Sequence, residues 1–174
     1  MSTPRIVIIG FMAAGKTTVA RALAMRLDSA WLDLDEFINA REGCSVPAII
    51  NAEGELRFRE IETEALRAAL ATDACVIALG GGAWMREVNR ALIAQHDCVT
   101  IWLDAPFELC WQRINKSADV RPLAPDRATA RARYDERRAF YQLAAHRFAA
   151  NTAASADELA ADILARLEPA TKKS

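Results

Sequence analysis

The chain has 174 residues, of which 52% are hydrophobic and 26% are charged, and its formal net charge is −1 at pH 7. This length and composition predict one globular domain and exclude collagen-like, coiled-coil and disordered chains. A net charge near zero argues against a general binder of nucleic acid or of membrane surfaces, since such proteins need an excess of Lys and Arg. Arginine supplies 18 of the 22 basic residues, which favours planar, two-pronged recognition of anions.

The sequence predicts a cytoplasmic protein. Its longest apolar run, residues 74–85, is shorter than the about 18 residues that cross a bilayer. The four cysteines form no Cys-x-x-Cys pair, which is typical of reduced thiols rather than of a disulfide framework or a metal site. Residues 5–15 resemble a secretory signal, but two glycines and the Lys16 that follows favour another interpretation.

Short β-branched runs alternate with helical patterns along the chain. Strands are predicted at residues 5–9, 30–33, 75–79 and 98–103, with a short one at about 147–149. Helices are predicted at residues 16–27, 35–41, 46–51, 53–70, 86–94, 106–114, 127–145 and 156–167, and a loop at 115–125. This alternation predicts a parallel sheet covered by helices on both faces. Ligands of such sheets bind beyond the carboxyl ends of the strands, so the residues that follow these ends should meet in one crevice.

The segment from Gly10 to Thr17 reads Gly-Phe-Met-Ala-Ala-Gly-Lys-Thr and matches the phosphate-binding loop pattern G-x-x-x-x-G-K-[ST]. It lies between a predicted buried strand and a predicted helix, as the mechanism requires. Backbone N–H groups of the loop and the N-terminus of the helix can surround phosphate oxygens. Lys16 can reach the β and γ phosphates, and the Thr17 hydroxyl can ligate Mg²⁺. The segment therefore predicts a nucleotide site, with an ordinary glycine-containing turn as the alternative.

Two carboxylates, Asp33 and Asp35, end the second predicted strand. Alternation in an extended segment would aim both to one side and Leu34 to the other. One could then hold the Mg²⁺ shell while the other accepts a proton from a substrate hydroxyl. The alternative is an acidic helix N-terminus with Asp35 as its cap.

Three glycines, Gly80 to Gly82, follow the third predicted strand. They would place bare backbone N–H groups at the crevice, and a tight turn is the alternative. Arg121 lies in the polar stretch at 115–125. Phosphoryl transfer needs a cation over the γ-phosphate and protection from water, so a mobile segment that carries arginine is expected there.

These motifs agree in order and spacing with a known family: from Ile6 to Leu167 the sequence resembles the shikimate kinases. The resemblance rests on the phosphate-binding loop and on Leu32-Asp-Leu-Asp35, Phe58-Arg-Glu-Ile-Glu62, Leu79-Gly-Gly-Gly82, Val120-Arg-Pro-Leu123 and Arg137-Arg-Ala-Phe-Tyr141. It implies an α/β fold of three layers, α/β/α, with a five-stranded parallel sheet of the P-loop NTPase and nucleoside monophosphate kinase kind. It further implies one kinase domain over residues 1–174, with a lid at about 115–126 and a substrate-binding helical segment at about 34–62.

The same resemblance implies a role for each motif residue. The catalytic residues would be Lys16, Asp35 as the base, and Arg121. Nucleotide would contact Gly10, Ala13, Ala14, Gly15, Lys16, Thr17, Thr18, Arg113 on the adenine, and Arg121. Shikimate would contact Asp35, Arg59, Glu62, Gly80, Gly81, Gly82 and Arg137, and Mg²⁺ would lie near Thr17 and Asp33.

Three positions depart from the family pattern. Ala13 stands where the family usually has glycine. Ala139 replaces a proline, which leaves open whether Arg137 or Arg138 is the second carboxylate ligand. The stretch after Ala150 lacks a basic residue that some members place near adenine.

The resulting hypothesis is an ATP-dependent kinase that phosphorylates the 3-hydroxyl of shikimate and acts as a monomer without nucleic-acid or membrane partners. One alternative is a kinase for another small hydroxy acid such as gluconate. The other is a non-catalytic nucleotide- or ligand-binding regulatory module of the same fold.

Overall fold

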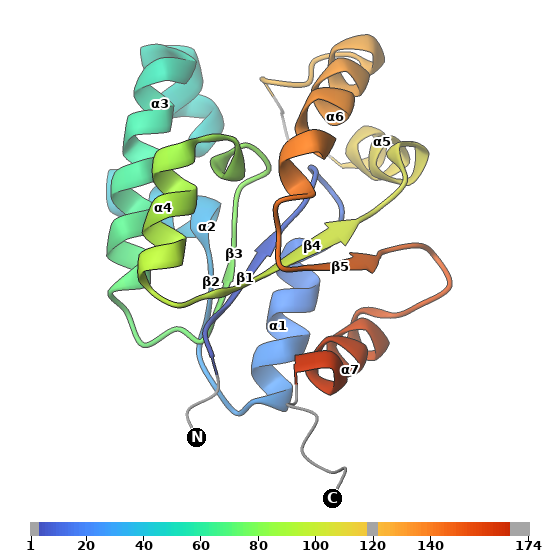
Figure 1. Ribbon diagram of the computed structural model, residues 1–174. Coiled ribbons are helices and arrows are strands. Elements are labelled where there is room, and N and C mark those ends of the chain that lie inside the picture. The colour runs from blue at the N-terminus through green and yellow to red at the C-terminus, as the bar shows by residue number, and fades with distance from the viewer. Residues whose placement is uncertain (1–3, 118–121, 168–174) are drawn as a thin grey trace, which may run out of the picture.

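A five-stranded parallel sheet forms the centre of the computed structural model, which describes residues 4–117 and 122–167 (Figure 1). The strands run in the order β2-β3-β1-β4-β5, and every neighbouring pair is parallel. Their bounds are Ile6–Ile9 (β1), Trp31–Asp33 (β2), Val76–Ala78 (β3), Val99–Asp104 (β4) and His146–Ala149 (β5). The predicted α/β fold with three layers is confirmed.

Helices cover the sheet in three groups (Figure 1). Helices α1 and α7 pack against each other below the sheet in this view, α2, α3 and α4 lie on the left, and α5 and α6 lie at the upper right. The helices are Lys16–Arg26 (α1), Leu34–Glu42 (α2), Val46–Leu70 (α3), Glu87–Gln95 (α4), Phe107–Lys116 (α5), Arg127–Tyr141 (α6) and Ala156–Leu167 (α7), with a short 3₁₀ turn, η1, at Ala83–Met85.

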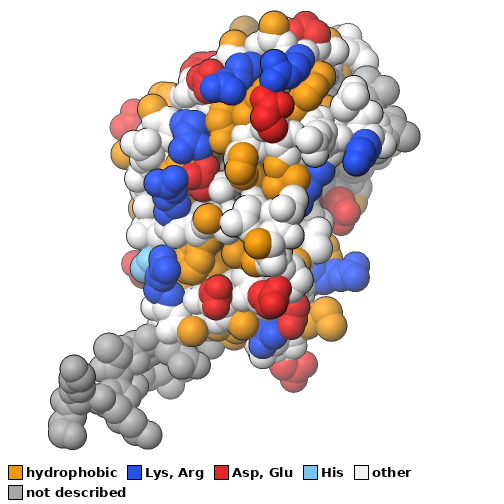
Figure 2. Space-filling model, turned by 90° about the vertical axis from the view of Figure 1, so that its right-hand side faces the viewer, with side chains coloured by type: hydrophobic (Ala, Val, Ile, Leu, Met, Phe, Trp, Pro, Cys, Tyr) orange, Lys and Arg blue, Asp and Glu red, His pale blue; other side chains and the backbone are white. Residues whose placement is uncertain are grey.

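The core follows from the apolar runs of the central strands. All four residues of β1 are at most 1% exposed, as expected for a parallel strand with helices on both faces. Helix α1 contributes Val19, Ala20, Leu23 and Ala24 to the same core. Surface charges of both signs are interspersed on the face shown in Figure 2. No helix within residues 4–117 and 122–167 has the length and apolar character needed to span a membrane.

The predicted break between two helices is present inside α3, where Gly54 has a non-helical φ of 85°. Two local differences from the sequence predictions have physical reasons. Helix α6 ends at Tyr141 and not at residue 145, because the Ala145 N–H donates to the Thr100 hydroxyl on β4 and leads the chain into β5. The turn η1 was not predicted, because three residues carry no detectable period.

The carboxyl ends of the strands meet at one edge of the sheet. At the opposite edge, Arg5 binds the backbone that leads from α3 towards β3. Its guanidinium donates to the carbonyls of Leu70, Thr72 and Ala74 at 2.5, 2.6 and 2.9 Å. Leu70 is the last residue of α3, and Thr72 and Ala74 follow it. The last carbonyls of a helix have no N–H partner within the helix, and the guanidinium group supplies donors here. Arg5 therefore joins α3 to the first strand, away from the ligand edge.

Replacing Arg5 with Ala should lower the free energy of unfolding by about 2 kcal/mol, because several partly buried carbonyls lose a charged donor. Urea denaturation measures this change. The control is Arg21→Ala on the exposed face of α1, which we expect to change stability by less than about 0.5 kcal/mol. Equal stability of both variants would contradict the role of Arg5.

Candidate active site

The loop between β1 and α1 wraps the N-terminus of α1. A side chain at Gly10 would place its Cβ 2.6 Å from the Leu103 carbonyl oxygen, so the loop passes β4 at a distance that only glycine allows. Gly15, with a φ of 98°, caps α1, and Lys16 Nζ donates to the Phe11 carbonyl at 2.8 Å. A loop of this shape at a helix N-terminus binds anions through its N–H groups.

Ala13 takes a φ of 59° in this loop. This left-handed conformation brings a Cβ close to the following carbonyl oxygen and costs an alanine about 1–2 kcal/mol. The loop therefore keeps its path without the glycine that usually stands at this position, and Ala13 is strained as a result.

Asp33 joins β2, α1 and α2. Its Oδ2 accepts the Thr17 hydroxyl at 2.5 Å, and its Oδ1 accepts the backbone N–H groups of Asp35 and Glu36 at 2.9 and 3.3 Å. Asp33 is thus the N-cap of α2, and Asp35 lies in the first helical turn. The predicted extended alternation of the two carboxylates is wrong, since the helix begins at Leu34; the alternative was right about an acidic helix N-terminus but wrong about which residue caps it.

Two cavities of about 670 and 700 Å³ adjoin at this edge of the sheet. They share Met12, Asp35, Gly80 and Gly81. We call the first the nucleotide lobe; of the predicted residues it is lined by Ala13, Ala14, Gly15, Lys16, Thr17, Thr18, Asp33, Asp35, Gly80, Gly81 and Arg113. We call the second the acid lobe; of the predicted residues it is lined by Asp35, Arg59, Glu62, Gly80, Gly81, Gly82 and Arg137. Asp35 therefore lies where the two lobes meet.

Two predicted features fall partly or wholly elsewhere. Arg121 lies outside the described residues. Of the predicted lid, Pro122 and Leu123 line the acid lobe.

Arg113 Nη1 donates to the Ala13 carbonyl at 3.0 Å, so this side chain is bound to the phosphate-binding loop.

The three glycines after β3 each make room for a charged side chain. A Cβ at Gly80 would lie 2.7 Å from Asp35 Oδ1, one at Gly81 3.2 Å from Arg137 Nη1, and one at Gly82 2.5 Å from Arg59 Nη2. The segment is also a tight turn, because the Ala83 N–H donates to the Gly80 carbonyl at 3.2 Å. Both interpretations of the glycines thus hold together.

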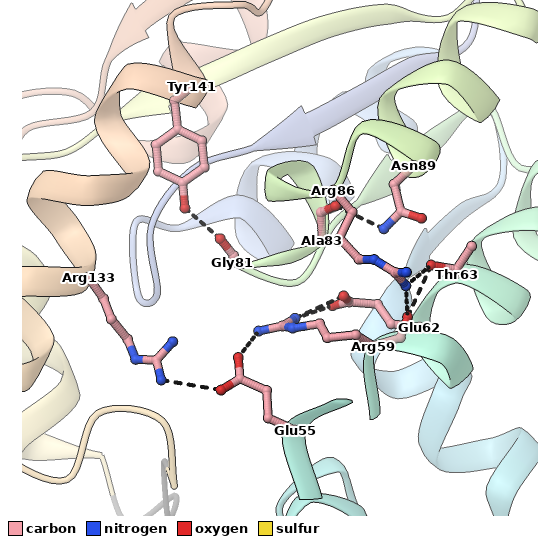
Figure 3. Close-up of polar contacts among 10 residues, drawn as sticks. All are labelled: Glu55, Arg59, Glu62, Thr63, Gly81, Ala83, Arg86, Asn89, Arg133 and Tyr141. Atoms are coloured by element: carbon pink, nitrogen blue, oxygen red, sulfur yellow. Dashed lines mark hydrogen bonds and ion pairs between the residues drawn. The ribbon is translucent and has the colours of Figure 1, made fainter. Parts of the chain in front are cut away.

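Arg59 and Glu62 form a buried ion pair on α3. Arg59 Nη1 lies 3.0 and 2.8 Å from the two carboxylate oxygens of Glu62, whose side chain is 1% exposed (Figure 3). Burial raises the pKa of Glu62 even though the positive charge of Arg59 lowers it. Arg86, which the sequence analysis did not identify, donates to the Arg59 carbonyl at 2.6 Å and to the Thr63 hydroxyl at 2.8 Å. It fixes the turn of α3 that carries Arg59.

Arg137, on α6, faces Arg59 across the acid lobe and is only 4% exposed. Within residues 4–117 and 122–167, carboxylates form ion pairs with Arg59, Arg133 and Arg138 but not with Arg137. Burial lowers the pKa of Arg137, and the positive charges of Arg59 and Arg133 lower it further. Burying a cation that no carboxylate pairs with directly costs free energy, so this position is suited to an anionic ligand.

Arg138, the alternative to Arg137, has partners outside both lobes. Its guanidinium donates to Asp104 at 2.6 Å and to the Tyr134 hydroxyl at 2.9 Å. Of the two neighbouring arginines, the structure therefore brings Arg137 into the crevice. A sequence pattern could not separate them, because the rotation of α6 depends on contacts with distant strands.

The glycine turn is fixed to α6 from two sides. The Tyr141 hydroxyl donates to the Gly81 carbonyl at 2.5 Å, and Trp84 Nε1 donates to the Phe140 carbonyl at 2.8 Å. Burial raises the pKa of Tyr141 to about 12, so its hydroxyl keeps the proton it donates at neutral pH. The turn and the helix that carries Arg137 are thereby held in one position.

We expect Ala13→Gly to raise the free energy of unfolding by about 0.5–1 kcal/mol. Glycine removes the strain at a φ of 59°, and part of this gain is lost to the greater freedom of glycine in the unfolded chain. Urea denaturation measures the change. The control is Ala40→Gly on the exposed face of α2, which should destabilise the protein by about 1 kcal/mol. A loss of stability in Ala13→Gly would contradict the strain.

Comparisons with known proteins agree with this geometry. The family model described as "Shikimate kinase" matches residues 12–168. A curated shikimate kinase of Salinibacter ruber is 41% identical over 82% of this chain and 74% of its own length, and one of a Synechococcus strain is 37% identical over 91% and 84%. A solved shikimate kinase of Acinetobacter baumannii, in complex with shikimate, superposes with a TM-score of 0.91 at 34% identity, covering 98% of this chain and 97% of that one.

A gluconokinase of Sinorhizobium meliloti superposes with a TM-score of 0.63 at 15% identity, covering 95% of this chain and 91% of that one. Such a likeness shows the shared fold alone. Together, the family model and the relatives show that the chain belongs to the shikimate kinase family.

Proposed function

We propose that this chain transfers the γ-phosphoryl group of ATP to the 3-hydroxyl of shikimate, giving shikimate 3-phosphate and ADP. The observation that carries the proposal is the buried Arg137 without a carboxylate partner among the described residues. It lies in a lobe that adjoins a phosphate-binding loop, with Asp35 at the junction.

The charges of the acid lobe favour one carboxylate. The lobe is lined by two guanidinium groups, those of Arg59 and Arg137, and by three carboxylates, of which Glu62 forms an ion pair with Arg59. Among the described residues no carboxylate forms an ion pair with Arg137, and the carboxylate of a monocarboxylic acid would fill that place. Guanidinium groups can hold a carboxylate through paired N–H donors, so the two arginines would fix both the position and the orientation of the acid.

Asp35 would act at the other end of the acid. Its carboxylate lies beside Gly80, where both lobes meet. There it would accept the proton of the substrate hydroxyl while the hydroxyl oxygen forms its bond to the γ-phosphorus and the bridging oxygen leaves with ADP. Fixing both ends of a small acid would align the hydroxyl with the phosphorus and lower the entropic cost of the reaction.

The phosphate-binding loop and Lys16 would hold the negative charge of the phosphates. The Thr17 hydroxyl and the Asp33 carboxylate are hydrogen-bonded to each other, and both are hard oxygen ligands. This pair fits Mg²⁺, whose remaining coordination positions would be filled by phosphate and water. When bound there, Mg²⁺ would neutralise charge on the β and γ phosphates. The described residues contain no cluster of three or more His, Cys, Asp or Glu that could hold a metal alone. Arg113 would contact the adenine, and Arg121 is proposed for the phosphates on the family resemblance alone.

The proposal includes one kinase domain that acts as a monomer in the cytoplasm. Segment 34–62 would form most of the acid-binding side, which is supported by the position of Asp35, Arg59 and Glu62 in the acid lobe. Segment 115–126 would serve as the lid.

Adding shikimate to the pure protein with ATP and Mg²⁺ should produce ADP, whereas gluconate or no acceptor should not. In Arg137→Lys the KM for shikimate should rise at least about tenfold, because an ammonium group cannot offer paired donors. The KM for ATP should stay unchanged, since Arg137 lines the acid lobe only. The control is Arg131→Lys at an exposed ion pair of the same helix. ADP formation with gluconate alone, or equal effects on both KM values, would contradict the assignment.

Asp35→Asn should reduce kcat with shikimate by about 100- to 10,000-fold, because the amide cannot accept the hydroxyl proton. The control is Glu42→Gln, an exposed carboxylate at the end of the same helix that lines neither lobe. Steady-state ADP release measures both variants. A kcat for Asp35→Asn within a few fold of the unchanged protein would remove Asp35 from the role of base.

A further inference from the structure

A second layer of charges lies outside the two acid-binding arginines. Glu55 precedes Arg59 by four residues on α3, and Arg133 precedes Arg137 by four residues on α6. Glu55 Oε1 accepts from Arg59 Nη2 at 3.1 Å, and its Oε2 accepts from Arg133 Nη2 at 3.3 Å (Figure 3). Arg59 and Arg137 line the acid lobe, whereas Glu55 and Arg133 do not. One carboxylate therefore bridges the two helices that carry the anchors.

Glu55 and Glu62 hold different nitrogens of Arg59. Nη1 is held by both oxygens of Glu62 and Nη2 by Glu55, while the guanidinium group as a whole lies against Gly82. An acid that binds Arg59 through Nη2 competes there with Glu55, whereas Nη1 stays with the buried Glu62. The Glu55 side chain is 38% exposed and has a second cation beside it. It can leave Arg59 without becoming an isolated charge.

Glu55 stays ionised at neutral pH. Burial alone would raise its pKa, but the hydrogen bond from Arg59 and the charges of Arg133 and Arg59 outweigh burial and lower the pKa below its usual value. The two layers together contain the guanidinium groups of Arg59, Arg133 and Arg137 and the carboxylates of Glu55 and Glu62. The sum is one positive charge, so a monoanionic acid can join without expelling either internal carboxylate from the cluster.

We propose that Glu55 is a displaceable counter-ion of Arg59, which gives up Nη2 to the carboxylate of the substrate and remains bound to Arg133. The inference deepens the proposed function and depends on it. Glu55 does not touch the substrate and acts through Arg59, so it is a positioning residue that sets affinity and specificity. A molecule has to carry a carboxylate to compete with Glu55, which disfavours neutral polyols of similar size.

Glu55→Gln tests the competition, because the amide keeps the size of the side chain and loses its charge. The KM for shikimate should fall about two- to fivefold, in the range of a partly exposed ion pair. The kcat and the KM for ATP should change by less than about twofold, since Glu55 lies outside the nucleotide lobe. The control is Glu60→Gln, whose carboxylate pairs with Arg57 on the outer side of α3 and should leave all three parameters unchanged.

The variant Arg133→Gln distinguishes displacement of Glu55 from Arg59 from a direct attraction between Arg133 and the acid. Loss of Arg133 removes the second partner of Glu55, which should then hold Arg59 more firmly and raise the KM for shikimate about two- to fivefold. In the double variant with Glu55→Gln this increase should disappear. If Arg133 instead attracts the acid directly, the increase would persist in the double variant, and the inference would be overturned.

The two proposals fail in different ways. A wild-type protein that releases no ADP with shikimate would overturn the proposed function and this inference with it. An active wild-type protein in which Glu55→Gln leaves the KM for shikimate unchanged or raises it would overturn this inference alone. Thermal unfolding of every variant shows that the comparison is made between folded proteins.

Discussion

Two guanidinium groups, those of the partly buried Arg59 and the buried Arg137, line the same lobe although their charges repel each other. Such an arrangement is stable only when other groups supply negative charge and the backbone leaves space. Glu62 supplies one carboxylate from beneath Arg59, and the glycine turn leaves the space, because a Cβ at Gly81 or Gly82 would crowd one of the two guanidinium groups. The turn after β3, α3 and α6 together provide the space and the charges around these two cations.

The remaining charged residues around this pair hold the scaffold. Arg86 donates to the carbonyl of Arg59 and so fixes one helix. Arg138 does the same for the other helix, since it binds Asp104 at the end of β4. Arg138 and Arg137 are neighbours in sequence, yet only Arg138 has a carboxylate partner among the described residues. The absence of such a partner distinguishes Arg137 from the structural arginine beside it.

Local sequence signals predicted the strands, the phosphate-binding loop and the position of the glycine turn, because each depends on neighbouring residues. The family resemblance added Arg59 and Glu62, which the charge pattern of α3 alone could not single out. The predicted direction of the Asp35 side chain was wrong, because it depends on the residue at which α2 begins. Pattern reasoning also could not find the bridge from Glu55 to Arg133, since these residues are far apart in the chain and carry no motif of their own.

The hydrogen bonds from Tyr141 to Gly81 and from Trp84 to Phe140, which connect the glycine turn and η1 to α6, have a consequence for binding. They hold the backbone beside the acid lobe in a single arrangement, so the proposed binding site for the carboxylate is preorganised. Association then orders few main-chain torsions, and more of the interaction energy is retained as affinity. Adaptation to an incoming acid falls to long, partly exposed side chains at the rim, which can change rotamers within nanoseconds.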